Sequence, residues 1–182
     1  MLAGCTFWPA DVAARYRAAG YWDGRTLWQM MADTVRRWPD KTALVAGPLR
    51  QSYRELDEVS GALAAALLER GLRPLQRVVL HLPNGPEFVH YYLALVRMGA
   101  IPVMALRAHR RAEVEHFVRA SGAVAYIAPD VIRGFDYRAL GATLQQQFAA
   151  LRTVVIVGEP GPGQLSHQDL LAQGQAMPDR AA

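Results

Sequence analysis

The stretch from Arg77 to Glu113 constrains the fold of this chain more than any other part of it. A short apolar run is followed by the turn Pro83-Asn84-Gly85, a helical segment that is apolar on almost every face, a second apolar run and a basic turn. Two buried strands joined by a helix form a βαβ unit with parallel strands. The pattern continues after this stretch, which predicts an α/β fold with a mostly parallel sheet and flanking helices.

The predicted elements follow this alternation. Strands are expected at residues 77–82, 101–106, 124–128 and 153–157, and helices at residues 86–98, 110–121 and 137–150. The helix at 86–98 is apolar all round, so it must be buried on more than one side. A chain of 182 residues is expected to leave part of that helix uncovered, which suggests that a larger body belongs around it.

The N-terminal third is predicted to precede the sheet. Residues 1–25 form an arm with a short helix, and its aromatic residues are expected to pack onto the domain: Phe7, Trp8, Tyr16, Tyr21 and Trp22. Thr26 caps a helix that ends before Pro39, and residues 42–46 and 49–52 form a hairpin. Ser52 and Glu55 form a capping box that begins the next helix.

Three domain segments result from these elements. Residues 1–25 are the arm, residues 26–157 are the α/β domain, and residues 158–182 are expected to be a loop and linker with at most a short helix at 165–173. Prolines and glycines from Gly158 to Gly163 support the loop.

Composition excludes several classes of protein. The formal charge is +4, but Lys41 is the only lysine and the arginines are spread along the chain, whereas a nucleic-acid-binding protein usually concentrates its charge on one face. No run reaches the roughly 18 apolar residues of a membrane span. One cysteine, Cys5, excludes an internal disulfide and favours a reducing compartment, so we expect a cytoplasmic protein.

Motif searches give one candidate binding segment. The chain has no P-loop, no GxGxxG and no GxSxG motif, and its histidines have no metal-binding spacing, so we expect neither catalytic residues nor metal ligands. Arg107 and Arg110 lie in a basic turn between a strand and a helix, where α/β sheets bind ligands. They are candidate contacts for a phosphate or a pantetheine arm; the alternative is a solvated basic turn.

Several short stretches together resemble one enzyme family. They are Phe7-Trp8-Pro9, Arg15-Tyr16, Gly20-Tyr21-Trp22 with Leu27, Gln51–Leu56, His81–Gly85, Leu95–Leu106 with Gly99–Pro102, His109–Glu113 and Gly134–Tyr137. As a set over residues 7–157, they are similar to the 2,3-dihydroxybenzoate– and salicylate–AMP ligases of siderophore pathways. These enzymes belong to the acyl-adenylate-forming, or AMP-binding, superfamily. Residues 26–157 would then be part of an adenylation domain.

The resemblance implies a two-step reaction. ATP, with Mg²⁺, and an aryl acid give an aryl-adenylate, and the acyl group then passes to the phosphopantetheine thiol of an aryl carrier protein. The family's phosphate-binding loop and C-terminal lid lie beyond the motifs matched here, and Lys41 matches neither family lysine. We therefore expect an N-terminal part of such a ligase that is not catalytic by itself and that binds ATP poorly.

Three alternatives remain open from the sequence. The chain could derive from an acyl-CoA ligase of the same superfamily, although the aryl-type N-terminal segment argues against it. It could be the product of a truncated or split gene that works with a separately encoded C-terminal half. It could also be an interaction module without ATP binding.

Overall fold

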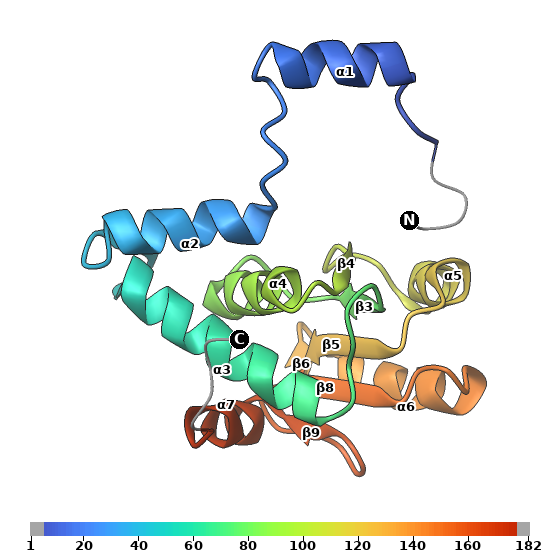
Figure 1. Cartoon of the computed structure of the whole chain (residues 1–182). Helices are drawn as coiled ribbons and strands as arrows, with labels where there is room; N and C mark the ends of the chain where they lie inside the picture. Colours follow the sequence, from blue (N-terminus) through green and yellow to red (C-terminus); the bar gives the residue numbers. More distant parts are fainter. Residues whose placement is uncertain (1–5, 178–182) are drawn as a thin grey trace.

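A computed structural model describes residues 6–177 and has a five-stranded parallel sheet at its centre (Figure 1). The strand order is β4-β3-β5-β8-β9, with every neighbouring pair parallel. The bounds are β3 Arg77–Leu80, β4 Ile101–Met104, β5 Ala125–Pro129, β8 Thr153–Val157 and β9 Leu165–Ser166. The predicted α/β fold with a mostly parallel sheet is confirmed, and β8 has the predicted bounds.

Helices cover both faces of this sheet (Figure 1). On one face lie α3 (Tyr53–Glu69), α4 (Pro86–Arg97) and α7 (His167–Gln175), and on the other lie α5 (Arg111–Ser121) and α6 (Tyr137–Gln147). Alternation along β3 shows the division, because Val78 and Leu80 join the first hydrophobic cluster and Val79 joins the second. The core therefore consists of two apolar layers, one on each side of the sheet.

Local signals place the elements before the sheet. The hairpin β1 (Thr42–Ala46) and β2 (Leu49–Ser52) has the predicted bounds. At the start of α3, the Ser52 hydroxyl accepts from the Glu55 amide at 3.2 Å, and the Glu55 carboxylate accepts from the Ser52 amide at 2.7 Å. Thr26 and Gln29 make the same reciprocal pair at the start of α2 (Leu27–Arg37). Both predicted caps are confirmed.

Helix α4 is better covered than the sequence predicted. It packs between the sheet, α3 and α2, and none of its large apolar side chains is exposed. Tyr91, Ala94 and Leu95 are fully buried. The expectation that part of this helix lies bare is wrong, because α2 and α3 supply the second layer that an all-round apolar helix needs.

The N-terminal arm does not pack onto the domain as predicted. Helix α1 (Ala10–Ala18) stands apart from the sheet layers, connected by an extended segment to α2 (Figure 1). The arm's rings contact one another, with centroids 5.7 Å apart for Trp8 and Trp22 and 5.2 Å apart for Tyr16 and Trp22. Trp8 remains 62% exposed and Tyr21 76% exposed. The arm is a small aromatic cluster of its own.

The C-terminal segment also differs from its prediction. The expected loop and linker of 158–182 instead contains β9, which joins the sheet, and α7, which packs closely on α3. Two hydrophobic contacts attach α7: Leu170 is buried in the core, and the ring of His167 is buried against Tyr91. The predicted short helix at 165–173 is present but begins at His167. Cys5 and residues 178–182 lie outside the described residues.

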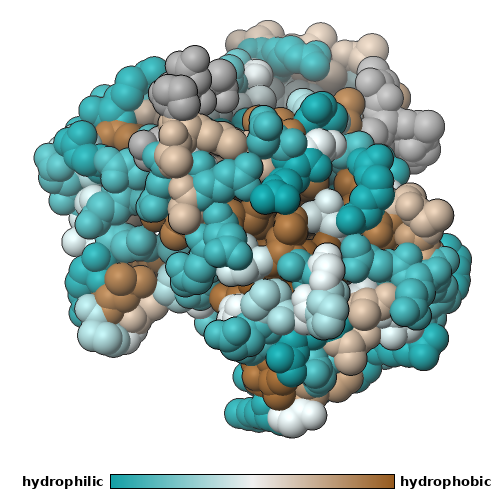
Figure 2. Space-filling model, turned by 90° about the horizontal axis from the view of Figure 1, so that it is seen from below, coloured by the Kyte–Doolittle hydropathy of each residue, from teal (hydrophilic) through white to brown (hydrophobic). Residues whose placement is uncertain are grey.

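Figure 2, which views the molecule from below, shows a largely hydrophilic face with hydrophobic surface between the polar groups. Among residues 6–177, no helix is long and apolar enough to cross a membrane.

Candidate functional site

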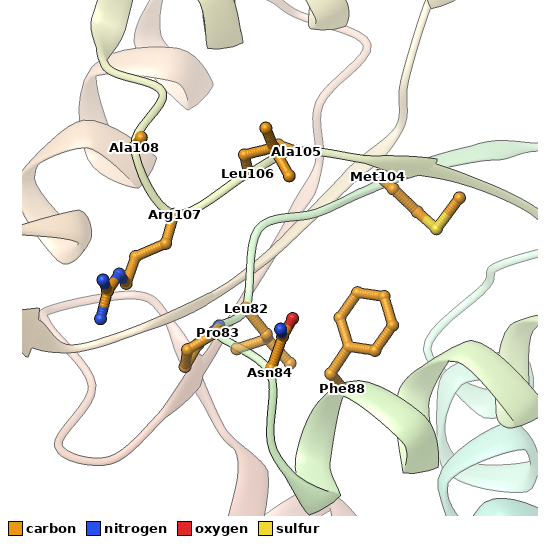
Figure 3. Close-up of a pocket in the computed structure, with 9 residues that line it drawn as sticks. All are labelled: Leu82, Pro83, Asn84, Phe88, Met104, Ala105, Leu106, Arg107 and Ala108. Carbon is orange, nitrogen blue, oxygen red and sulfur yellow. The ribbon is translucent and has the colours of Figure 1, made fainter.

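A pocket opens at the carboxyl ends of the neighbouring strands β3 and β4 (Figure 3). Its volume is about 590 Å³. Its lining comes from the segment after β3, the first turn of α4 and the end of β4 with the loop that follows: Leu82, Pro83, Asn84, Phe88, Met104, Ala105, Leu106, Arg107 and Ala108. This is the edge at which parallel α/β sheets bind ligands.

The two ends of the pocket have different chemistry. Figure 3 shows Phe88 and Met104 facing each other at one end, while the Arg107 side chain extends past Pro83 at the other. Met104 is 60% exposed and Leu106 is 68% exposed, so apolar surface is open to a ligand or a neighbouring polypeptide. The arrangement suits a molecule with an apolar part and an anionic end.

Arg107 and Arg110 occupy different environments despite their closeness in sequence. Within residues 6–177, the guanidinium of Arg107 has no hydrogen bond or ion pair. The Arg110 guanidinium donates to the main-chain oxygens of Arg107 and His109 at 2.8 and 2.9 Å, and it stacks over Phe135 at 4.3 Å from the ring centroid. Arg110 therefore stabilises the turn, whereas Arg107 can contact an anion.

The turn after β4 is fixed by several further bonds. The Leu106 amide donates to Nδ1 of His109 at 3.0 Å, and the His109 amide donates to the Leu106 oxygen at 2.9 Å. The Arg110 amide donates to the Glu113 carboxylate at 2.8 Å, and this bond is the chief cause that lowers the pKa of Glu113. The segment 105–109, which we call the rim loop, is thus a compact turn rather than a loose one.

A buried histidine lies beneath the rim loop. Nε2 of His81 lies 2.9 Å from the Leu106 oxygen, and its Nδ1 lies 2.9 Å from the Tyr126 hydroxyl. Burial, the largest cause, lowers the pKa of His81 to about 4, with smaller contributions from the charges of His109 and Arg110. His81 is therefore neutral at pH 7.

The described residues do not fit the phosphates of ATP. The loop Gly158–Gly163 is the glycine-rich candidate, but a Cβ at Gly158 would collide with the carboxylate of Asp130, and the Glu159 amide donates to that carboxylate at 3.2 Å. An acidic group thus fills the place that a phosphate would need. No cluster of three His, Cys, Asp or Glu residues suited to a metal ion occurs within residues 6–177. We assign no step through ATP or Mg²⁺ to these residues.

Sequence reasoning found one part of the pocket and missed the rest. It selected Arg107 because a basic turn followed a strand. It placed Phe88 on a helix that is apolar on almost every face and Met104 and Leu106 within a buried strand, whereas β4 ends at Met104. Both turns, at Pro83 and from Arg107 to Arg111, were predicted; what the sequence did not reveal is that the apolar residues Met104 and Leu106 beside them are exposed.

Comparisons with known proteins agree with this fold. The family model of the AMP-binding enzymes matches residues 31–178. The chain is 47% identical to the salicyl-AMP ligase / salicyl-S-ArCP synthetase of Mycobacterium tuberculosis over 88% of the chain and 29% of that protein. It is 38% identical to the 2,3-dihydroxybenzoate-AMP ligase of Bacillus subtilis over 98% of the chain and 33% of that protein.

A solved structure agrees over nearly the whole chain. The apo structure of MbtA from Mycobacterium smegmatis has a TM-score of 0.85 and 36% identity, and the match covers 97% of this chain and 32% of that one. The chain thus spans about a third of the length of the relatives it matches. On this fold and this similarity, the chain belongs to the AMP-binding enzyme family and corresponds to the N-terminal part of its aryl-acid–AMP ligases.

Proposed function

We propose that this chain is the N-terminal part of an ATP- and Mg²⁺-dependent ligase that adenylates salicylate or 2,3-dihydroxybenzoate and passes the aryl group to a carrier-protein thiol, as in siderophore biosynthesis. The observation that carries the proposal is the 47% identity to a salicyl-AMP ligase over most of the chain. Adenylation itself requires a phosphate-binding loop, and the Asp130 carboxylate beside Gly158 and Glu159 makes the glycine-rich loop Gly158–Gly163 unsuited to that role. The chain alone is therefore inactive in this proposal.

The pocket has a defined part in this function. A phosphopantetheine arm is a flexible chain with a phosphate at its protein-bound end. The unpaired cation of Arg107 suits that phosphate, and the apolar surface of Leu106 and Met104 suits the methylene-rich chain. Arg110 contributes indirectly, because its guanidinium holds the turn that carries Arg107.

A chimera tests the activity. The residues of the Mycobacterium tuberculosis salicyl-AMP ligase that match this chain are replaced by it, and aryl-acid-dependent exchange of pyrophosphate into ATP is measured. We expect exchange with salicylate or 2,3-dihydroxybenzoate, and no binding of ATP·Mg²⁺ by the isolated chain in calorimetry. A folded chimera that activates neither acid would contradict the proposed family function. Micromolar ATP binding by the isolated chain would show a nucleotide site in it.

The same chimera tests the acceptor and the role of Arg107. With a phosphopantetheine-bearing aryl carrier protein as acceptor, Arg107→Gln should raise KM about tenfold, the loss of one charged hydrogen bond. Arg152→Gln is the matched control. Arg152 is also exposed, but it directly precedes β8 and so lies at the amino ends of the strands, away from the pocket. Efficient transfer to free coenzyme A instead of the carrier protein would favour the acyl-CoA ligase alternative.

A further inference from the structure

Three buried rings converge beneath the rim loop from separate parts of the chain. His81 follows β3, Tyr126 lies in β5, and Tyr137 begins α6. Their exposed fractions are 1% or less. The His81 ring lies edge-on to Tyr137, with centroids 5.0 Å apart, and tilted to Tyr126, with centroids 5.9 Å apart. We call these three residues the ring cluster.

The polar atoms of the ring cluster lead to two main-chain oxygens of the rim loop. Nε2 of His81 contacts the oxygen of Leu106 at 2.9 Å, and the Tyr137 hydroxyl donates to the oxygen of Arg107 at 3.1 Å. The two residues whose oxygens are held, Leu106 and Arg107, line the pocket. The bonds therefore fix consecutive peptide groups at the base of the side chain that offers a free cation to the pocket.

Geometry also determines the proton position on His81. A carbonyl oxygen can only accept, so Nε2 of His81 must donate its hydrogen to Leu106. Nδ1 then has a free lone pair and accepts from the Tyr126 hydroxyl. The Leu106 oxygen thus selects the tautomer, Tyr126 donates to the lone pair that this tautomer leaves on Nδ1, and each polar atom of the cluster has a partner.

We propose that His81, Tyr126 and Tyr137 are positioning residues, which hold the Leu106 and Arg107 peptide groups and thereby set where the Arg107 guanidinium enters the pocket. Apolar rings of the same size would fill this space without the cost of burying polar groups. Two of the polar atoms present here, Nε2 of His81 and the Tyr137 hydroxyl, bond to the rim loop, and the remaining bond joins His81 to Tyr126. The inference rests on the proposed function only in treating this pocket as the binding site.

The test compares tyrosine-to-phenylalanine variants on the two sides of the sheet. Tyr137→Phe removes the bond to the Arg107 oxygen. Tyr91→Phe is the matched control: Tyr91 is fully buried, and its hydroxyl bonds to His167 at 3.0 Å on the opposite face. Amide hydrogen exchange is measured by NMR on the intact chain, with global stability determined for each variant by denaturant.

The Leu106 and His109 amides report on the rim loop, since both bond within it. After correction for global stability, Tyr137→Phe should speed exchange at these amides about fivefold over Tyr91→Phe, the factor for one net hydrogen bond. Equal rim exchange in the two variants would overturn the proposal. If Tyr137→Phe does not fold, Tyr126→Phe provides the same comparison.

Two further readouts separate this inference from the proposed function. Nitrogen-detected NMR of the His81 ring should show its hydrogen on Nε2, and a hydrogen on Nδ1 would overturn the assigned role of His81. In the chimera, Tyr137→Phe should raise KM for the carrier and add little to Arg107→Gln, because both act on one contact. Additive effects would overturn the positioning role, whereas an inactive chimera would count against the proposed function and leave the exchange result standing.

Discussion

The two ends of this chain reverse what their compositions suggest. The N-terminal arm is rich in aromatic residues but leaves Trp8 and Tyr21 mostly exposed. The segment of β9 and α7 has three glutamines, one glycine and no Phe, Tyr or Trp, yet it completes the sheet and packs on α3 and α4. The end with the larger rings contributes little to the core, and the end with the smaller residues closes it.

Close backbone approach explains the difference. Gly174 in α7 lies so near the main chain of α3 that a Cβ would overlap the oxygen of Ala62. On α3 the residue at this contact, Ala62, is also small and fully buried. Two helices without large side chains between them can bury their backbones against each other. The aromatic rings of the arm instead pack against one another and not against the domain.

The largest expected effect of a single substitution comes from Gly174→Ala. The clash is with backbone, which no rotamer change relieves, so α7 must move away from α3 and uncover Leu170. We expect a loss of about 4 kcal/mol in the free energy of unfolding, measured by urea denaturation followed by circular dichroism. Gln175→Ala, an exposed change in the next residue of the helix, should cost less than about 0.5 kcal/mol. A neutral Gly174→Ala would mean that α7 is not locked to α3.

A fall in pH should have the next largest effect, because it destabilises the part of the fold that contains buried histidines and the arm contains none. Burial is the largest cause lowering the pKa values of His81, to about 4, and of His167, the first residue of α7; residues 6–26 have no histidine. Above pH 6.5, the ordinary histidine pKa, the two histidines are neutral in the folded and in the unfolded chain, and their full contribution to the free energy of unfolding is present. As the pH falls from 6.5 toward 4, these histidines are protonated in the unfolded chain but stay neutral in the folded chain. The free energy of unfolding therefore falls by about 3 kcal/mol for His81 alone.

Urea denaturation at a series of pH values measures this loss. His167→Gln and His81→Gln should each flatten the dependence between pH 6.5 and 4, because each removes one group with a lowered pKa. An unchanged slope in both variants would contradict the assignment.

Two probes distinguish the regions of the molecule. All four tryptophans lie within residues 8–38, so their fluorescence reports on the arm and α2, while circular dichroism reports mainly on the helices of the α/β domain.

The sequence predicted those features that depend on local signals. Caps at Thr26 and Ser52, the hairpin around Gly47 and the alternation of strands and helices are each determined by a few neighbouring residues. The place of α7 depends on Gly174 meeting Ala62, a contact across more than a hundred residues that no local pattern reveals. In the candidate site, Arg107 was predictable from its turn, but the bonds from His81 and Tyr137 to the rim loop required the fold.

Deleting the arm should have the smallest effect and gives the sharpest contrast. Removing residues 1–22 discards the aromatic cluster as a unit, so few contacts with the domain are lost; we expect a change below about 1 kcal/mol in the free energy of unfolding by circular dichroism. Removing residues 161–182, an equal length, takes away β9 and α7 and should prevent stable folding. A loss above about 2 kcal/mol on deleting the arm would show that its rings support the core after all. A neutral result would mean that Trp8 and Tyr21 do not stabilise this α/β domain, which leaves both rings mostly exposed.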